Sequence, residues 1–180
     1  MVSHEEIRKL AGSFAHKAHS AKDQRRKYTG EPYAVHPLRV SYLVADVTDD
    51  PSLLIAACLH DVLEDTNTTK QEIADKFGQR VADLVEELTD VSKPEDGNRQ
   101  TRKALDRERI SKVSADAKTI KLADLIDNTV DIVTHDPDFA KVYLEEKRLL
   151  LEVLKEGNPK LYAMATTIME QGFNKIKELK

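Results

Sequence analysis

The chain has 180 residues, of which 40% are hydrophobic and 33% are charged, and its formal net charge is −4. This length and composition predict one domain (residues 1–180) with its own core and argue against disorder. The acidic balance excludes a general nucleic-acid-binding protein, which would carry a basic excess. A single cysteine, Cys58, excludes an internal disulfide framework and suits a reducing compartment. Without a signal-like segment or a membrane-length apolar run, we expect a cytoplasmic protein that contacts no membrane.

Apolar residues recur at helical spacing along most of the chain. Ser3 with Glu6, and Thr69 with Glu72, fit capping boxes at helix starts. Four prolines stand where a first helical position is expected: Pro37, Pro51, Pro137 and Pro159. The predicted helices lie near 3–20, 38–47, 51–65, 69–77, 79–91, 99–113, 116–134, 137–155 and 159–178. Strand patterns are nearly absent, so the sequence predicts an all-α globule of roughly eight to ten helices.

Two segments are predicted to be irregular. "AKDQRRKYTGEPYAV" (21–35) precedes His36, and "SKPEDGN" (92–98) contains proline, glycine and asparagine. The second segment is too short for a domain linker, so we expect a mobile loop there.

Four ionisable residues follow the apolar run in "SLLIAACLHDVLEDT" (52–66). On a continuous helix His60 would share a face with Glu64, and Asp61 with Asp65. Because an unpaired buried charge is costly, such groups are neutralised, paired or given to a metal. The alternative is that the helix simply emerges into solvent after Leu59.

Two further residues complete a candidate constellation. His36 follows a turn in "GEPYAVHPL", and Asp124 lies in the otherwise apolar "AKTIKLADLIDNTVDIV". Alone, a histidine beside a proline is usually structural and a helical aspartate is usually solvated. Together with His60 and Asp61 they give two imidazoles and two carboxylates, a mixed donor set for a divalent metal such as Mn, Fe, Co or Zn.

This H…HD…D pattern is the one used by HD-superfamily metal-dependent phosphohydrolases. Four blocks, "RRKYTGEPYAVHPL", "AACLHDVLEDT", "FGQRVADLVEELTDVSK" and "IKLADLIDN", closely resemble the hydrolase domain of the RelA/SpoT family and its stand-alone small alarmone hydrolases. The resemblance covers roughly residues 10–135, with the blocks in the same order as in that family. It implies that the whole chain is one HD-type domain.

The resemblance also implies roles for the charged residues. Four residues would hold a catalytic ion, with Mn²⁺ expected and other divalent first-row metals as alternatives: His36, His60, Asp61 and Asp124. Glu64 and Asp65 would orient or deprotonate the attacking water.

The resemblance further implies contacts with the substrate. Asn128 matches the asparagine of the family that contacts the nucleotide. Arg26 and Lys27 resemble the Arg-Lys pair that meets the base and phosphates, although one extra residue separates them from "TGEPY".

The sequence departs from the family in one block. The family commonly has "LADRLHN" followed by Met-Arg or a similar pair, whereas this chain has "LADLIDNTVDI". Leu125 and Val130 therefore replace arginines, and Asp127 replaces the histidine. The loss of cations should change how the phosphates or the base are held, so a 3′-pyrophosphate on an adenine nucleotide is an alternative to the guanine substrate.

Replacement cations are offered by "NRQTRKALDRERI". Arg102 and Lys103 follow the predicted loop, and Arg109 comes two turns later. The alternative is a solvated helix face on which Asp106 and Glu108 balance these cations.

Tyr143 and Lys147 are four residues apart on one predicted helix. They could close over the base and a phosphate. Alternatively, Tyr143 packs in the core while Lys147 pairs with Glu145, Glu146 or solvent.

The remaining histidines are expected outside the site. His4, His16 and His19 are predicted to be surface residues, and His135 is predicted to end a helix, where a cation is favourable. The spacing assigns no role to Tyr33.

The leading hypothesis is a small alarmone hydrolase that removes the 3′-pyrophosphate from a small nucleotide, ppGpp, pppGpp or an adenine counterpart, without a synthetase or regulatory domain. A second is an HD phosphohydrolase that releases orthophosphate from a 5′-nucleotide or from NADPH. A third is a non-catalytic nucleotide sensor or antitoxin-type partner. A homodimer is the default expectation for a soluble oligomer.

Overall fold

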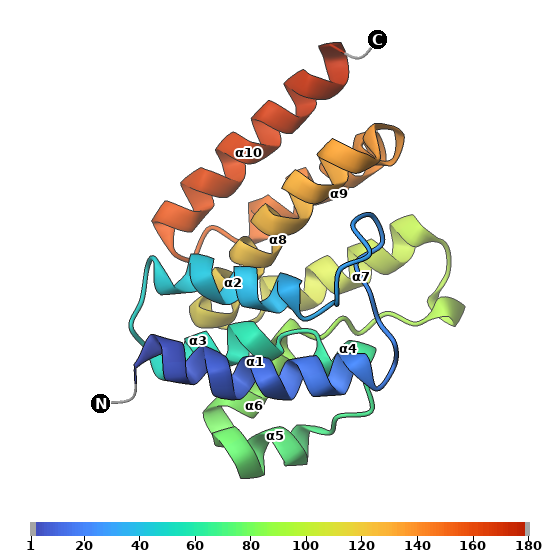
Figure 1. Ribbon diagram of the computed structural model, residues 1–180. Helices are drawn as coiled ribbons and strands as arrows, with labels where there is room; N and C mark the ends of the chain where they lie inside the picture. The colour runs from blue at the N-terminus through green and yellow to red at the C-terminus, as the bar shows by residue number, and fades with distance from the viewer. Residues whose placement is uncertain (1–2, 179–180) are drawn as a thin grey trace. The chain divides into compact units, whose positions relative to one another are not determined.

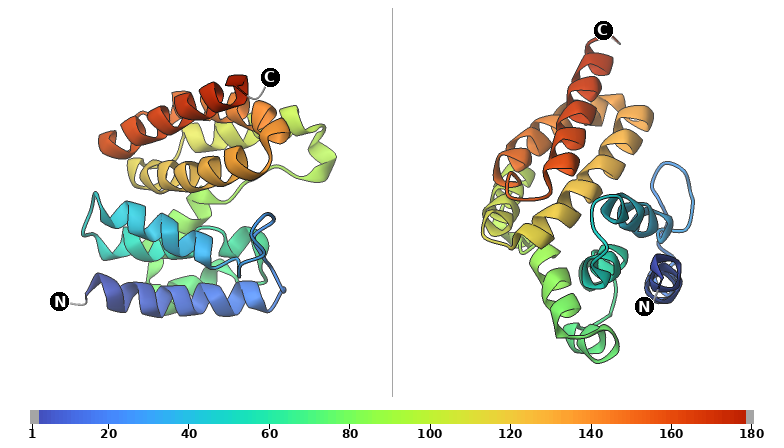
Figure 2. Two further views of the ribbon diagram at one scale, coloured as in Figure 1. Left: turned by 45° about the horizontal axis from the view of Figure 1, so that its top comes forward. Right: turned by 90° about the vertical axis from the view of Figure 1, so that its left-hand side faces the viewer.

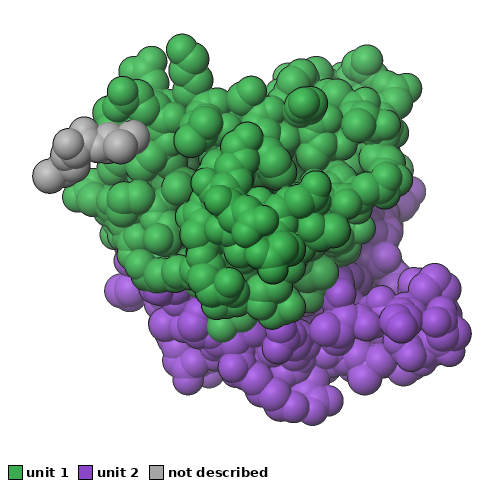
Figure 3. All heavy atoms as spheres, turned by 90° about the horizontal axis from the view of Figure 1, so that it is seen from below, with its two compact units in different colours: residues 1–89 green, residues 90–180 purple. Residues whose placement is uncertain are grey.

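The computed structural model describes residues 3–178. Ten α-helices and one 3₁₀ helix make up its regular structure, and the only β feature in this range is an isolated bridge between Arg25 and Pro32. The predicted all-α class is confirmed. The chain divides into two compact units, residues 1–89 and 90–180, coloured separately in Figure 3. A single HD-type domain over residues 1–180 stays a prediction.

Unit 1 is built around one apolar helix. Its helices are α1 (His4–Ser20), α2 (Val35–Ala45), α3 (Pro51–Leu59), α4 (Val62–Asp65), α5 (Lys70–Phe77) and α6 (Gln79–Leu88). Helix α3 is apolar on nearly every side, and it packs against α1, α2 and α6 (Figure 1). A helix without a polar face must be covered all round. It therefore forms the centre of this unit.

Both predicted capping boxes form in unit 1. Ser3 and Glu6 form a capping box, as do Thr69 and Glu72. Gly78 ends α5 with φ +95°, a backbone conformation that favours glycine. These local hydrogen bonds satisfy the helix-end amides that have no partner within the helix.

Helix α2 begins earlier than predicted. Its first residue is Val35, so Pro37 lies inside the first turn and not at the first position. Proline is tolerated there because the amides of the first turn have no acceptor within the helix.

The helix predicted over 51–65 is wrong in one respect, because it is interrupted. Helix α3 ends at Leu59 and α4 begins at Val62. His60 Nδ1 lies 2.9 Å from the carbonyl of Ala57, which in a continuous helix would accept from the amide of Asp61. The side chain thus takes over a backbone acceptor at the point where the helix stops. His60 and Glu64 consequently do not share the face of one helix.

Unit 2 consists of η1 (Pro94–Asp96), α7 (Arg99–Ser111), α8 (Ala115–His135), α9 (Pro137–Val153) and α10 (Pro159–Glu178). Helix α8 packs against α9 and α10, and α7 packs against α9 (Figure 2). The bounds of α10 are those predicted, and the bounds of α7, α8 and α9 differ from the predicted ones by at most two residues. The predicted irregular segment 92–98 contains η1, and its mobility stays a prediction. Within residues 3–178, no helix combines the length and apolar character needed to cross a membrane.

Gly157 supplies a test of the packing in unit 2. A Cβ at this position would lie 2.8 Å from Leu122 Cδ1 and 3.1 Å from backbone atoms of Lys118 and Thr119. Because backbone atoms cannot move aside cheaply, Gly157→Ala should lower the free energy of unfolding by about 1–3 kcal/mol. Urea denaturation measures this loss. The exposed neighbour Lys155 is the control, because Lys155→Ala should change stability by less than about 0.5 kcal/mol; equal effects would contradict the packing described.

Candidate functional site

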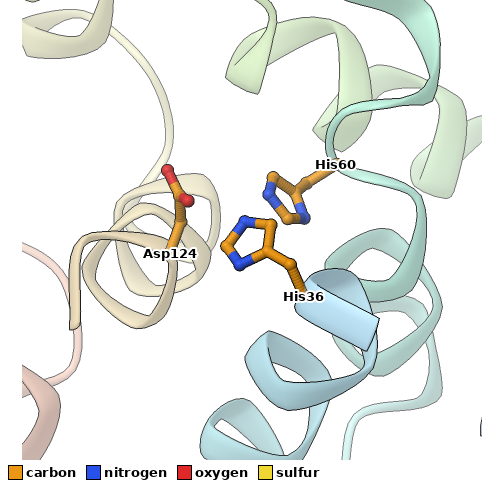
Figure 4. A group of neighbouring side chains, drawn as sticks. All are labelled: His36, His60 and Asp124. Atoms are coloured by element: carbon orange, nitrogen blue, oxygen red, sulfur yellow. The ribbon is translucent and has the colours of Figure 1, made fainter. Parts of the chain in front are cut away.

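The break between α3 and α4 brings three predicted metal ligands of unit 1 together. Nε2 of His60 lies 3.0 Å from Asp61 Oδ2, and Nε2 of His36 lies 3.7 Å from the same oxygen. The two imidazole rings are 5.1 Å apart between centroids (Figure 4). Both histidines are buried. Two ring nitrogens therefore converge on one carboxylate oxygen.

The hydrogen bond of His60 fixes which ring nitrogen can bind a cation. A carbonyl has no proton to give, so Nδ1 must donate to Ala57. In a neutral ring, Nε2 then presents its lone pair to the Asp61 oxygen. Two lone pairs 3.0 Å apart repel unless a proton or a cation stands between them. The donor set in unit 1 thus fits a cation, and the backbone carbonyl orients the ligand from behind.

Tyr33 is a residue of this group that sequence reasoning missed. Its hydroxyl donates to Asp61 Oδ2 over 2.8 Å, and its ring lies 5.9 Å from that of His36. Its place in "PYAVHPL", three residues before His36, was the available signal. Tyr33 holds the orientation of the Asp61 carboxylate.

The two predicted catalytic carboxylates have different surroundings. Glu64 is exposed, whereas Asp65 is partly buried and accepts a hydrogen bond of 2.8 Å from Gln24 Nε2. Burial raises the pKa of Asp65, and the negative charge of Asp61 adds to this rise, while Gln24 and the histidines oppose it. A raised carboxyl pKa suits proton transfer near neutral pH. The catalytic roles themselves stay predictions.

The other predicted residues of unit 1 are placed as follows. Arg26 is buried, and Lys27 Nζ lies 3.2 Å from the hydroxyl of Tyr28. The prediction that His19 is a surface residue is wrong: only 1% of it is exposed, because the segment after α1 folds over it. His16 is exposed as predicted.

In unit 2, Asp124 projects from α8 (Figure 4) and is buried. Asn128 Nδ2 donates to its Oδ1 over 2.6 Å, and Lys121 Nζ lies 3.0 Å from its Oδ2. Asn128 is thus a partner of a predicted metal ligand, one helical turn away. Its predicted contact with a nucleotide is not tested by this hydrogen bond.

Three lysines surround a small cavity in unit 2. The cavity measures about 50 Å³ and is lined by Asp90, Lys103, Asp106, Lys121, Glu146 and Lys147, among others. Lys103 Nζ contacts Asp90 at 2.9 Å and Asp106 at 3.4 Å. Burial opposes the charge of Asp90, but the field of the lysines outweighs it and lowers the pKa of this carboxyl.

The solvated-face interpretation of α7 is wrong for Asp106. This residue is 5% exposed and accepts hydrogen bonds from the amides of Val91 and Ser92 and from the Ser92 hydroxyl. Buried carboxylates need such partners, and no signal in the sequence placed Ser92 beside it. Arg102 and Arg109 are half-buried on α7, while Glu108 is exposed and pairs with Lys112.

Tyr143 and Lys147 lie together on α9. Tyr143 is buried with its hydroxyl 3.3 Å from Thr129 Oγ1, and Lys147 Nζ lies 5.2 Å from the centre of its ring. The alternative partners proposed for Lys147 are engaged elsewhere, because Glu145 pairs with Arg148 and Glu146 with Arg99. Burial, and then the repulsion of Lys121, lowers the pKa of Lys147 to about 8.

Comparison with known proteins decides the family. The HD-domain family model matches residues 11–148. The chain belongs to the HD-domain family. His135 ends α8 as predicted, and the match extends beyond it into α9. The matched region contains both the His60–Asp61 pair and Asp124.

Two relatives and one solved structure show which kind of HD-domain protein the chain resembles. The guanosine-3′,5′-bis(diphosphate) 3′-pyrophosphohydrolase of Aquifex aeolicus is 41% identical over 80% of this chain, which spans only 19% of that protein. The enzyme of that name termed MESH1 from Xenopus tropicalis is 40% identical over 71% of this chain and 70% of its own length. A solved structure, described as a metazoan ortholog of SpoT that hydrolyzes ppGpp, is 31% identical with a TM-score of 0.80, covering 92% of this chain and 94% of that one.

These findings confirm the resemblance to RelA/SpoT-type hydrolases. They agree with a His/Asp metal site in this HD-domain chain, for which His36 and His60 of unit 1 each offer a ligand atom. The individual roles of the site residues are not tested by them and stay predictions.

The pKa of Lys147 can be tested through stability. The folded protein loses this proton near pH 8, whereas the unfolded chain keeps it until near pH 10.5. Between these values the unfolded state binds more protons, so the free energy of unfolding of the wild type should rise with pH relative to Lys147→Met. Urea denaturation of both proteins from about pH 7 to about pH 10 measures this difference. A difference that stays constant with pH would contradict the lowered pKa.

Proposed function

We propose that this chain hydrolyses the 3′-pyrophosphate of alarmone nucleotides, (p)ppGpp, (p)ppApp or both, and releases pyrophosphate and the 5′-nucleotide. The observation that carries the proposal is the convergence of His36 and His60 on the Asp61 carboxylate, in a chain of the HD-domain family. The named activity of the relatives from Aquifex and Xenopus supports the same reaction. The substrate is thus a small nucleotide.

We propose further that His36, His60 and Asp61 of unit 1 and Asp124 of unit 2 bind one divalent cation, with Mn²⁺ preferred. The donor types support this, because imidazole and carboxylate together suit divalent first-row metals. Such an ion would lower the pKa of a bound water and neutralise charge on the phosphoryl group. Ala57, Tyr33 and Asn128 would hold the ligands from behind.

The carboxylates after the break supply the proton chemistry. The oxygen of water forms a bond to the phosphorus carried by O3′, and the bond between that phosphorus and O3′ breaks. Glu64 or Asp65 accepts the proton from the water, and O3′ leaves with the electron pair and takes up a proton. Phosphoryl transfer needs positioning and charge stabilisation more than covalent help.

The small cavity of unit 2 that Lys103, Lys121 and Lys147 line is proposed to supply cations for the substrate. These cations would replace the two family arginines whose positions Leu125 and Val130 occupy in this chain. Leu125 is buried in the core of unit 2 and Val130 is exposed, so neither brings a charge. Lys147 and Lys103, with Tyr143 and Arg102, are proposed to meet the phosphates and the base. In unit 1, Arg26 and Lys27 take this role, and Asn128 is proposed to contact the nucleotide. The altered cation set is the reason for including adenine substrates.

The reaction is tested by separating the products on an anion-exchange column. Purified protein with Mn²⁺ is offered ppGpp, pppGpp and ppApp separately, and pyrophosphate with the matching 5′-nucleotide is expected. Removal of the metal with a chelator should abolish turnover and re-addition should restore it. The double change His60→Ala with Asp61→Ala should be inactive because the donor set is lost. If all three substrates survive intact, the proposal is overturned.

A matched variant separates binding of the metal from chemistry. Glu64→Gln keeps size and polarity but removes one of the two proposed proton acceptors. If Glu64 is the one that accepts the proton, turnover should fall on the order of 10²–10⁴-fold while metal binding persists. Unchanged turnover would contradict the role of Glu64. The same assay would identify the other hypotheses: orthophosphate from a 5′-nucleotide or NADPH indicates a different HD phosphohydrolase, and nucleotide binding without products indicates a sensor or antitoxin-type protein. Cytoplasmic location and a homodimer stay predictions.

Lys147 gives a sharper test of substrate recognition. A hydrogen bond to a charged group contributes about 1.5–3 kcal/mol, so Lys147→Met should raise KM at least about tenfold. The exposed Lys141 on the same helix is the control, and Lys141→Met should leave KM unchanged. Steady-state kinetics on the preferred substrate measures both. Equal KM values for the two variants would remove Lys147 from the binding site.

A further inference from the structure

A buried histidine stands behind the predicted catalytic carboxylate of unit 1. His19 lies in the last turn of α1, and only 1% of its surface is exposed. Its Nδ1 lies 2.7 Å from Gln24 Oε1, and Gln24 Nε2 lies 2.8 Å from Asp65 Oδ2. His19, Gln24 and Asp65 thus form one continuous chain of hydrogen bonds, called the line below, that ends on Asp65.

The direction of these hydrogen bonds follows from their ends. An ionised Asp65 can only accept, so the amide nitrogen of Gln24 faces it and the amide oxygen faces His19. That oxygen has no proton, so Nδ1 of His19 must donate. The ring therefore carries a proton on Nδ1. Its other nitrogen, Nε2, is buried and has no hydrogen-bond partner among residues 3–178.

The backbone after α1 is shaped to make this line. Asp23 adopts φ +49°, a left-handed conformation that few residues other than glycine take up. The bend returns Gln24 to the helix end, where its amide donates to the carbonyl of His19 over 3.2 Å. The carbonyl of Gln24 in turn accepts from the amide of Tyr33. Gln24 is therefore fixed at both its backbone and its side chain.

His19 also touches the metal-ligand side of unit 1. Its ring lies 4.8 Å from that of Tyr33, whose hydroxyl donates to Asp61. One ring thus supports two carboxylates, Asp65 through Gln24 and Asp61 through Tyr33. An apolar ring would fill the same space without burying an unpartnered nitrogen, so packing alone does not account for a histidine here.

We propose that His19 is a positioning residue that, through Gln24, fixes the carboxylate of Asp65 toward the attacking water. The inference rests on the proposed function, in which Asp65 takes part in proton transfer. Because His19 acts through another side chain, its loss should lower kcat and leave KM nearly unchanged.

Two substitutions at this position place an amide donor at different distances from the backbone. The amide of asparagine can occupy the position of Nδ1, whereas that of glutamine reaches the position of Nε2. His19→Asn should therefore retain kcat within about threefold, and His19→Gln should lower kcat about 10–100-fold, the range found for partners that orient site residues. Gln24→Met, which breaks the line, should match His19→Gln. The exposed His16 is the control, and His16→Asn should leave kcat unchanged.

A spectroscopic readout tests the geometry without turnover. The nitrogen chemical shifts of His19 in the wild-type protein should report a proton on Nδ1. An Nδ1 without a proton would overturn the inference, as would equal kcat values for His19→Asn and His19→Gln in folded proteins. If the wild type releases no pyrophosphate, the proposed function fails, and the nitrogen shifts still decide whether His19 holds Gln24 as described.

Discussion

The polar side chains of the candidate site in unit 1 are arranged around one atom, Oδ2 of Asp61. Both imidazoles approach it and the hydroxyl of Tyr33 donates to it. Groups of this kind resist burial unless they are paired or hold a cation. The apolar helix α3 supplies the opposite tendency, because its burial fixes the end from which His60 and Asp61 project. A strong hydrophobic anchor thus holds polar side chains in an arrangement that they would not adopt by themselves.

Unit 2 handles charge differently. Asp106 and Asp90 are satisfied by amides, a hydroxyl and lysines, whereas Lys147 lies over an aromatic ring in surroundings that disfavour its charge. An anionic ligand would relieve the repulsion between Lys147 and Lys121. In the free protein the repulsion between the two lysines disfavours their charged forms, and a bound phosphate would offset that repulsion.

The irregular segment 21–34 of unit 1 places a side chain beside a site carboxylate at each of its two ends. The bend at Asp23 brings Gln24 back to α1, and the end of the segment carries Tyr33 to Asp61. Hydrogen bonds at both ends of this segment fix the side chains of Gln24 and Tyr33. The groups it presents act by holding carboxylates, which is the general task of residues that surround a metal site.

The sequence by itself determined the helical class, most helix ends and the candidate ligands, because capping boxes, prolines and apolar spacing act over a few residues. It also identified the family, which the match over residues 11–148 confirms. Only the tertiary structure decided the break at His60, the burial of His19 and Asp106, and the partners of Asp65. The break depends on a side chain that replaces a backbone donor, the burial of His19 depends on the bend of the segment after α1, and Asp65 and Asp106 depend on partners from other segments. Helical periodicity carries no record of these contacts.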